Sequence, residues 1–229
     1  MVWFFRAAYG NTLILSLTDA STLARAPQAQ QVARVCRSCL KENDPQLLGV
    51  LGGYLLSAIR ATPALDAVDV WSCYPGARSA SQPLEVLASF PRTFRSMIDC
   101  GPVLLRHRPC LPRHLTAQGQ YDPLGQLSTL QVNPAYDLRG KSVAVLDDYL
   151  TYGVCAASAA VLLQAAGATR VACISIGKFG NVTCRYEVQI LGDPQQPPVL
   201  AECKGRSPLI GQHDRRMHQK FQAILTQYL

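Results

Sequence analysis

The chain has 229 residues, of which 48% are hydrophobic and 16% are charged, and its 16 glycines and 15 prolines are spread along its length. This composition is typical of a globular protein with a buried core, and it excludes a disordered, collagen-like or coiled-coil chain. The formal charge of +7 favours anionic partners, but phosphorylated small molecules satisfy that preference as well as nucleic acid or a membrane surface does.

The cysteines and the N-terminus indicate the compartment. The nine cysteines cannot all pair in internal disulfides, and their scatter among apolar segments favours reduced thiols in a cytosolic protein. Residues 1–6 lack the basic start and the small-residue cleavage site of a signal peptide. The longest apolar run, 47–59, contains three glycines and is too short to span a bilayer. We therefore expect a cytoplasmic protein without a membrane partner.

The chain is expected to begin with a β-hairpin. Apolar residues fill 3–9 and 12–17, and the Gly10-Asn11 pair between them tolerates the positive φ angles of a hairpin turn.

Two helices are predicted to follow the hairpin. Apolar residues recur at helical spacing over 28–40, and a second helix is expected over 45–60, directly after an Asp-Pro pair. The second helix contains three glycines, which we expect to let a neighbouring element approach closely: Gly49, Gly52 and Gly53.

The middle of the chain changes to an alternation of strands and loops. A short strand over 68–71 runs into the breaker-rich loop 72–79, which is where α/β proteins place ligands. Helical segments over 83–98 lead to a strand candidate at 103–105. The stretch 106–140 has no sustained periodicity, and long irregular segments within a compact domain are usually functional or mobile.

The strongest pattern lies between residues 142 and 176. Residues 142–146 are predicted to form a buried strand, 147–152 a polar turn, 153–166 a helix and 170–176 a second buried strand. This order defines a βαβ unit, whose strands are parallel and whose crossover is right-handed. The sequence therefore predicts an α/β fold with a parallel sheet flanked by helices.

One segment within this unit carries recognisable chemistry. Four apolar residues precede Asp147 and Asp148, and a Thr-x-Gly turn then begins the helix. Neighbouring carboxylates can accept hydrogen bonds from paired hydroxyls, as on a ribose, while the free amides of a helix N-terminus bind phosphate. The two features are separated by about the length of a sugar phosphate.

The segment from Val143 to Cys155 resembles the signature of type I phosphoribosyltransferases that binds 5-phosphoribosyl diphosphate (PRPP). The resemblance implies that Asp147 and Asp148 face the ribose 2′- and 3′-hydroxyls. It also implies that the following loop wraps the 5-phosphate, with these residues: Leu150, Thr151, Tyr152, Gly153, Val154 and Cys155.

The wider arrangement looks like the ComF-like branch of that family. Such proteins have a pyrophosphate-binding strand and loop, here 68–78, then a Leu-x-Arg stretch, here 104–106, and a segment with a Gln and an Asn, here Gln118 and Asn133. The pyrophosphate residues implied by this resemblance are Tyr74, Pro75, Gly76, Arg78 and Arg106.

The resemblance implies a phosphoribosyltransferase that uses Mg²⁺ and PRPP, modifies a nitrogenous base and releases pyrophosphate, or acts in reverse on a nucleoside monophosphate. Asp147 and Asp148 would be its catalytic residues. A single domain, 1–229, is expected, with its core at about 28–180. Residues 1–20 and 177–229 would form a base-covering hood and a C-terminal extension. The acceptor base is not indicated, and a homodimer is one option for the assembly.

The sequence also leaves alternatives open. Tyr152 and Cys155 replace hydroxyl residues of the signature, and an Arg common before the Asn is absent. These departures favour a PRPP- or nucleotide-sensing module with reduced catalysis, linked through its basic surface to nucleic-acid processing. A Cys36-x-x-Cys39 pair could contribute to a zinc site only with distant partners, so a zinc-dependent nucleic-acid module is a third reading. The last helix, about 213–227, is most simply a surface helix.

Overall fold

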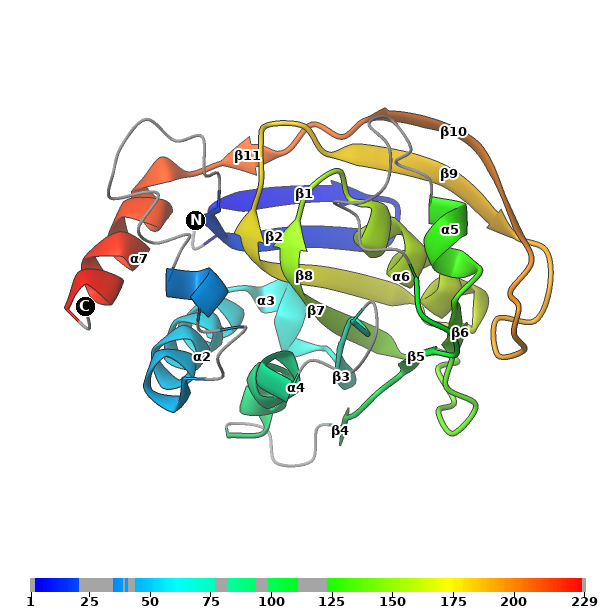
Figure 1. The fold of residues 1–229 in the computed structure, drawn as a ribbon, viewed down its shortest axis with the longest axis horizontal. Helices are drawn as coiled ribbons and strands as arrows, with labels where there is room; N and C mark the ends of the chain where they lie inside the picture. Colours follow the sequence, from blue (N-terminus) through cyan, green and yellow to red (C-terminus); the bar gives the residue numbers. More distant parts are fainter. Residues whose placement is uncertain are drawn as a thin grey trace.

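A central sheet of seven strands organises the part of the chain that the computed structural model describes, which is residues 3–20, 35–38, 40, 44–76, 82–93, 99–110 and 123–227. The strand order across the sheet is β11 (Gln212–His213), β1 (Phe5–Tyr9), β2 (Thr12–Asp19), β8 (Arg170–Lys178), β7 (Ser142–Leu150), β3 (Val70–Cys73) and β4 (Asp99–Cys100). Neighbours from β2 to β4 pair in parallel, whereas β1 and β11 are antiparallel (Figure 1).

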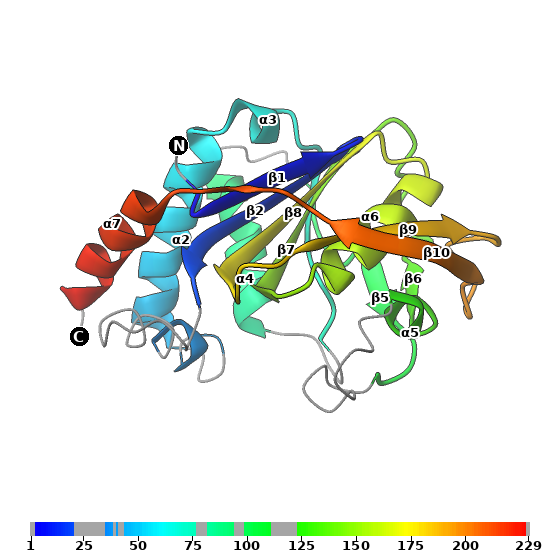
Figure 2. The ribbon, with the colours of Figure 1, turned by 90° about the horizontal axis from the view of Figure 1, so that it is seen from above.

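The two faces of the sheet are covered by different elements. One face packs against α2 (Pro45–Arg60), α4 (Gln82–Ser89) and α7 (Arg215–Thr226). The other face packs against α6 (Val154–Ala165), α5 (Pro123–Leu127), and the strand pair β5 (Leu104–Arg106) and β6 (Leu130–Val132) (Figure 2). A short helix, α3 (Pro63–Asp66), and a 3-10 turn, η1 (Phe90–Thr93), connect elements on the first face. The protein is therefore an α/β protein with a mostly parallel sheet flanked by helices.

Strand β7 explains why the sheet is buried on both sides. Its residues alternate between the two hydrophobic cores, with Ala144 and Leu146 in one and Val143 and Val145 in the other. A strand that is buried on both faces has a continuous apolar sequence, as parallel strands usually do. The βαβ unit predicted for 142–176 is confirmed, because β7 and β8 pair in parallel on either side of α6 in the sequence.

The N-terminal hairpin is confirmed, but its position differs from the expectation of a hood. β2 pairs in parallel with β8, from Thr12 opposite Val171 to Asp19 opposite Lys178. The hairpin thus belongs to the central sheet, and the core begins well before residue 28. β2 is buried on both faces, with leucines on one face and Ile14 between small hydroxyl residues on the other, which suits a strand inside the sheet.

Several other predicted elements are present in the structure, some with different surroundings. The helix 45–60 is confirmed as α2, and of 28–40 the described residues 35–38 and 40 are helical. The strand candidate at 103–105 is β5, which pairs with β6 in a small separate sheet. Within 106–140 the structure also contains α5, while residues 111–122 lie outside the described part.

A two-stranded ribbon in the C-terminal third was not predicted. β9 (Cys184–Ile190) and β10 (Ala201–Pro208) pair antiparallel, and the Pro/Gln-rich loop 193–198 connects them. Tyr186 and Val188 turn toward α6, next to Val154 and Ala157. The ribbon therefore adds a layer outside α6.

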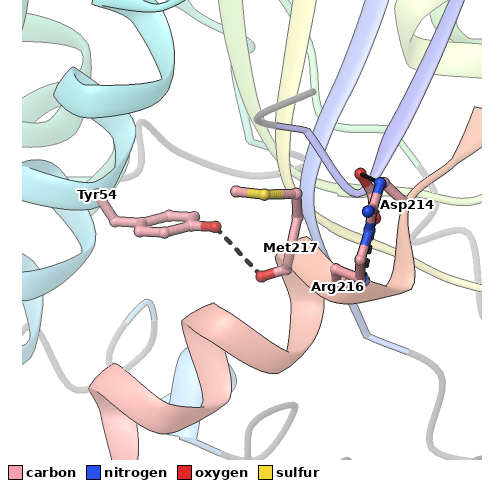
Figure 3. Close-up of polar contacts among 4 residues, drawn as sticks. All are labelled: Tyr54, Asp214, Arg216 and Met217. Atoms are coloured by element: carbon pink, nitrogen blue, oxygen red, sulfur yellow. Dashed lines mark hydrogen bonds and ion pairs between the residues drawn. The ribbon is translucent and has the colours of Figure 1, made fainter.

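Helix α7 is capped by Asp214 and is held to α2 by Tyr54. The Asp214 carboxylate caps it by accepting a hydrogen bond from the Arg216 amide at 3.0 Å, and also forms an ion pair with the Arg216 side chain. The Tyr54 hydroxyl of α2 donates to the Met217 carbonyl at 3.2 Å (Figure 3), and the Tyr54 ring packs 4.7 Å from that of Phe221. Burial, aided by the Asp214 charge, raises the pKa of Tyr54 to about 12, so the phenol keeps its donor hydrogen.

The described part of the chain bears on the predicted state of the cysteines and on the possibility of a membrane span. The eight cysteines in that part are free thiols, and Cys36 is buried in the same hydrophobic core as residues of α2. Cys39 lies outside the described residues, and within them no three His, Cys, Asp or Glu side chains gather as a metal site would require. No helix in the described part is long and apolar enough to cross a membrane.

The glycines of α2 provide a test of how this helix packs. A Cβ atom at Gly52 would lie 1.4 Å from a ring carbon of Phe90, whereas one at Gly53 would have nothing within 4 Å. Gly52→Ala should therefore push Phe90 aside and destabilise the protein by about 1–3 kcal/mol. Gly53→Ala should stabilise it by roughly 0.5–1 kcal/mol, because alanine favours helices. Urea denaturation of both variants measures the difference, and a loss of stability in Gly53→Ala would contradict this packing.

Candidate functional site

The sheet topology marks one place where a ligand is expected. The chain passes from β3 outward to β4 in one direction and from β7 to β8 in the other, so the strand order reverses between β3 and β7. Open α/β sheets bind ligands outside the carboxyl ends of the strands at such a switch point. The carboxyl ends of these two strands are directly joined, because the Tyr74 amide donates to the Leu146 carbonyl at 2.7 Å. This edge contains both loops singled out by the sequence.

The two aspartates lie in the strand itself and not in a turn. β7 continues to Leu150, with Asp147 opposite Ser175 and Tyr149 opposite Gly177 on β8. The predicted turn 147–152 is therefore wrong for its first four residues, because pairing with β8 keeps them extended. Only 151–153 form the bend.

Pairing with β8 also determines where the carboxylates point. Side chains alternate along a strand, so adjacent aspartates lie on opposite faces. Asp147 lines a small pocket with Cys155 and Cys173 on the α6 side, and Asp148 does not. Both carboxylates accept hydrogen bonds from the chain, Asp147 from the Asp148 amide at 2.9 Å and Asp148 from the Tyr149 amide at 2.6 Å.

Gly153 begins helix α6 in a conformation that few other residues adopt. Its φ angle is +85°, in the left-handed region, and a Cβ atom there would lie 2.9 Å from the Cys184 carbonyl oxygen. The Cys184 amide in turn donates to the Tyr152 carbonyl at 3.0 Å. The predicted phosphate loop is thus bounded on one side by the first residue of β9. Leu150, Gly153, Val154 and Cys155 are buried, while Thr151 and Tyr152 are half-buried.

Lys178 is a residue of this region that the sequence did not indicate. Its side chain is fully buried at the end of β8. The ammonium donates to the carbonyls of Phe179, Gly180 and Val182 at 2.9–3.1 Å and contacts that of Thr151 at 3.4 Å. An ammonium has three donors, so this ring of carbonyls uses all of them. Lys178 therefore ties the bend at Thr151 to the loop that precedes β9.

The environment of Lys178 changes its protonation. Burial lowers its pKa to about 8, against the opposing charges of Asp19 and Cys184. The only sequence signal for this role is a lysine at the end of an otherwise apolar strand, where a buried charge must find partners.

The predicted pyrophosphate loop is held by Arg106 of β5. The guanidinium donates to the Gly76 carbonyl at 2.7 Å and to the Pro75 carbonyl at 3.1 Å, and it also binds Thr129 and Gln126. Four of its five donor hydrogens are thus engaged with the protein. Arg106 fixes the shape of the loop at 75–76.

Tyr74 anchors the same loop in the core. Its hydroxyl donates to the Gln126 side chain at 3.1 Å, and the Arg106 guanidinium lies 5.9 Å from its ring centre. Burial raises the pKa of the phenol well above its usual value, Cys155 and Asp147 act in the same direction, and Arg106 opposes them. The structure brings Tyr74, Pro75, Gly76 and Arg106 together, whereas Arg78 and Gln118 lie outside the described residues. Asn133 shapes a turn, accepting from the Ala135 amide at 3.0 Å.

No family model matches the chain, and a search of curated proteins found no significant match.

The bend at Gly153 gives a first test of this geometry. Gly153→Ala should destabilise the protein by at least about 1–2 kcal/mol, the cost of a left-handed residue with a Cβ atom, and by more because Cys184 must move. Gly180→Ala is the matched control: its φ angle is +64°, but its Cβ atom would have nothing within 4 Å. Chemical denaturation compares the two. Equal losses would show that the Cys184 contact does not restrict the loop.

The pH dependence of stability tests the burial of Lys178. Lys178→Met should lose about 1–3 kcal/mol at neutral pH, because buried carbonyls lose their donor. The folded pKa, about 8, is below the unfolded value near 10.4, so the unfolded chain binds more protons between these two pH values. The wild-type free energy of unfolding should therefore rise, relative to Lys178→Met, from pH 8 to about pH 10.

The exposed Lys141→Met variant serves as control and should follow the wild type over the same range. A wild-type curve parallel to that of Lys178→Met would contradict the lowered pKa.

Proposed function

We propose that the protein binds PRPP or a related 5-phosphoribosyl compound at the carboxyl edge of β7 and acts as a phosphoribosyltransferase. The observation that carries this proposal is the coincidence of three features at one place. Asp147 and Asp148, the loop at Tyr74–Gly76 and the beginning of α6 all lie at the β3–β7 switch point. The proposal also rests on the resemblance of the segment 143–155 to the PRPP signature.

Different residues would contact different parts of the ligand. Asp147 and Asp148 would accept hydrogen bonds from the ribose hydroxyls. The bend at 151–153 and the first amides of α6, where Gly153 offers no side-chain cap, would bind the 5-phosphate. The loop at Tyr74–Gly76, whose shape Arg106 fixes, would contact the diphosphate.

In the reaction, a nitrogen nucleophile of the base would form a bond to the anomeric carbon. The bond from that carbon to the diphosphate oxygen would break, and pyrophosphate would leave with the electron pair. Bond breaking that leads bond making gives an oxocarbenium-like transition state, as in glycoside transfer. The protein would then act by positioning and by electrostatic stabilisation, without a nucleophile of its own.

The two carboxylates of the candidate site could provide part of the ligand set for Mg²⁺. Asp147 and Asp148 are half-buried oxygen donors at the proposed diphosphate edge, and within the described residues no third acidic, His or Cys ligand joins them. Mg²⁺ is commonly bound through one or two carboxylates together with substrate phosphates and water. When bound, the ion would neutralise the charge of the diphosphate.

A second candidate is a PRPP- or nucleotide-sensing module with little turnover. Three observations favour it. Asp147 and Asp148 lie on opposite faces of β7, Gly153 is enclosed by Cys184, and Arg106 spends most of its donors on the protein. Such a module would bind the ligand without releasing pyrophosphate.

The aspartates provide the test. Asp147→Asn combined with Asp148→Asn should weaken PRPP binding at least about tenfold and abolish transfer, because charge-assisted hydrogen bonds to the ribose become neutral ones. Titration calorimetry with PRPP and Mg²⁺ measures the affinity, and pyrophosphate release with candidate bases measures turnover. Asp137→Asn, an exposed aspartate just ahead of β7, is the matched control and should bind PRPP like the wild type.

Unchanged PRPP affinity in the double variant would overturn the assignment of the site. If the wild type binds PRPP but releases no pyrophosphate with any of the candidate bases, the sensing module is favoured.

A further inference from the structure

A larger cavity lies at the opposite edge of the sheet. The turn Gly10-Asn11 precedes β2, and Thr12 is opposite Val171 near the start of β8, so this turn is at the amino edge of the parallel strands. The cavity is lined by residues of this turn, of the last part of α6, and of the strands β9 and β10. Its volume is about 380 Å³, which is within the usual range for a small-molecule site. We call it the hairpin groove.

The hairpin groove carries positive charge from the ribbon. Arg185 of β9 and Lys204 of β10 line it together with the carboxylate of Glu187, and Lys204 also pairs with Glu202 on the same ribbon. The Arg185 guanidinium lies 5.7 Å from the centre of the Tyr9 ring. A cation–π contact of this kind uses none of the donor hydrogens of the guanidinium, so they remain available to an acceptor beside the ring.

Lys204 is the second cation, and its present contacts are weak. Its ammonium lies 3.0 Å from the Glu202 carboxylate and 3.0 Å from the Gln189 side-chain oxygen, all on the exposed face of the ribbon. Exposed ion pairs of this kind contribute little free energy. A dianionic group in the groove would therefore compete well for the ammonium.

The remaining lining can hydrogen-bond to a planar polar group. Side-chain amides come from three elements, Asn11, Gln164 and Gln189, and an amide both donates and accepts. Gln164 is oriented by its nitrogen, which donates to the Thr12 hydroxyl at 3.1 Å. Burial raises the pKa of Tyr9 to about 12, so its phenol stays neutral and keeps its hydrogen.

We propose that the hairpin groove is a binding site for a nucleoside monophosphate, separate from the edge that carries Asp147 and Asp148. Arg185 and Lys204 bind the phosphate, whose charge near −2 at neutral pH matches two cations. The Tyr9 ring and the side-chain amides contact the nucleoside. The inference stands on the groove alone and does not require the proposed transferase activity.

Binding is tested by calorimetry of the full chain with AMP, GMP, CMP, UMP and inorganic phosphate. At least one monophosphate should bind saturably and more tightly than phosphate. Arg185→Gln should weaken that binding at least about tenfold, the size expected for a lost charge-assisted pair. Arg206→Gln is the matched control, because Arg206 is exposed on β10 in the same ribbon and does not line the groove.

The position of the ligand is tested by photo-crosslinking. An azido-substituted form of the best monophosphate should label peptides that contain residues 9–12 or 185–204. The Asp147→Asn, Asp148→Asn double variant should keep this binding, and Arg185→Gln should keep any affinity for PRPP. The two sites can therefore fail independently.

Four results would overturn the proposal. The first is that none of the four monophosphates binds saturably to the wild type. The second is binding that survives in Arg185→Gln. The third is that phosphate alone binds as tightly as the nucleotide. The fourth is labelling at residues 147–156, which would assign the nucleotide to the carboxyl edge.

Discussion

The pairing of β7 with β8 on one side and β3 on the other is the constraint on which the rest of the structure depends. It keeps Asp147 to Leu150 extended, and it puts the bend that begins α6 directly at the carboxyl edge. It also brings the loop after β3 against Leu146. The two aspartates and the bend before α6 are thus positioned by one strand whose apolar sequence favours burial on both faces.

The sequence predicted the structure best where burial requires a recognisable pattern of apolar residues. The β7–α6–β8 unit could be predicted because a strand buried on both faces, a helix and a glycine stop follow one another within 142–176. The C-terminal end of β7 could not be predicted, because adjacent acidic residues usually favour a turn. Only pairing with β8 keeps Asp147 and Asp148 extended. β9 had a readable signal in its alternating Cys184, Tyr186, Val188 and Ile190, but its contact with Gly153 depends on packing between distant segments.

Strand β9 contacts both the candidate site at the carboxyl edge and the hairpin groove. Its first residue, Cys184, binds the Tyr152 carbonyl and encloses Gly153, and the next residue, Arg185, lines the hairpin groove. Lys178 ties the loop before β9 to Thr151 through backbone carbonyls. The ribbon is therefore a structural part of the candidate site, although it lies outside the segment that resembles the PRPP signature.

The position of β2 affects how the protein can be made. β2 is among the first elements to be synthesised, yet its partner β8 follows about 160 residues later, as the contact between Leu15 and Ser175 shows. Until β8 leaves the ribosome, an apolar hairpin has an unpaired strand edge, which is a template for unwanted association. Pairing so distant in sequence also slows folding. The nascent chain is consequently most exposed to aggregation before residue 178 has emerged, and truncation ahead of β8 removes the only described partner of that edge.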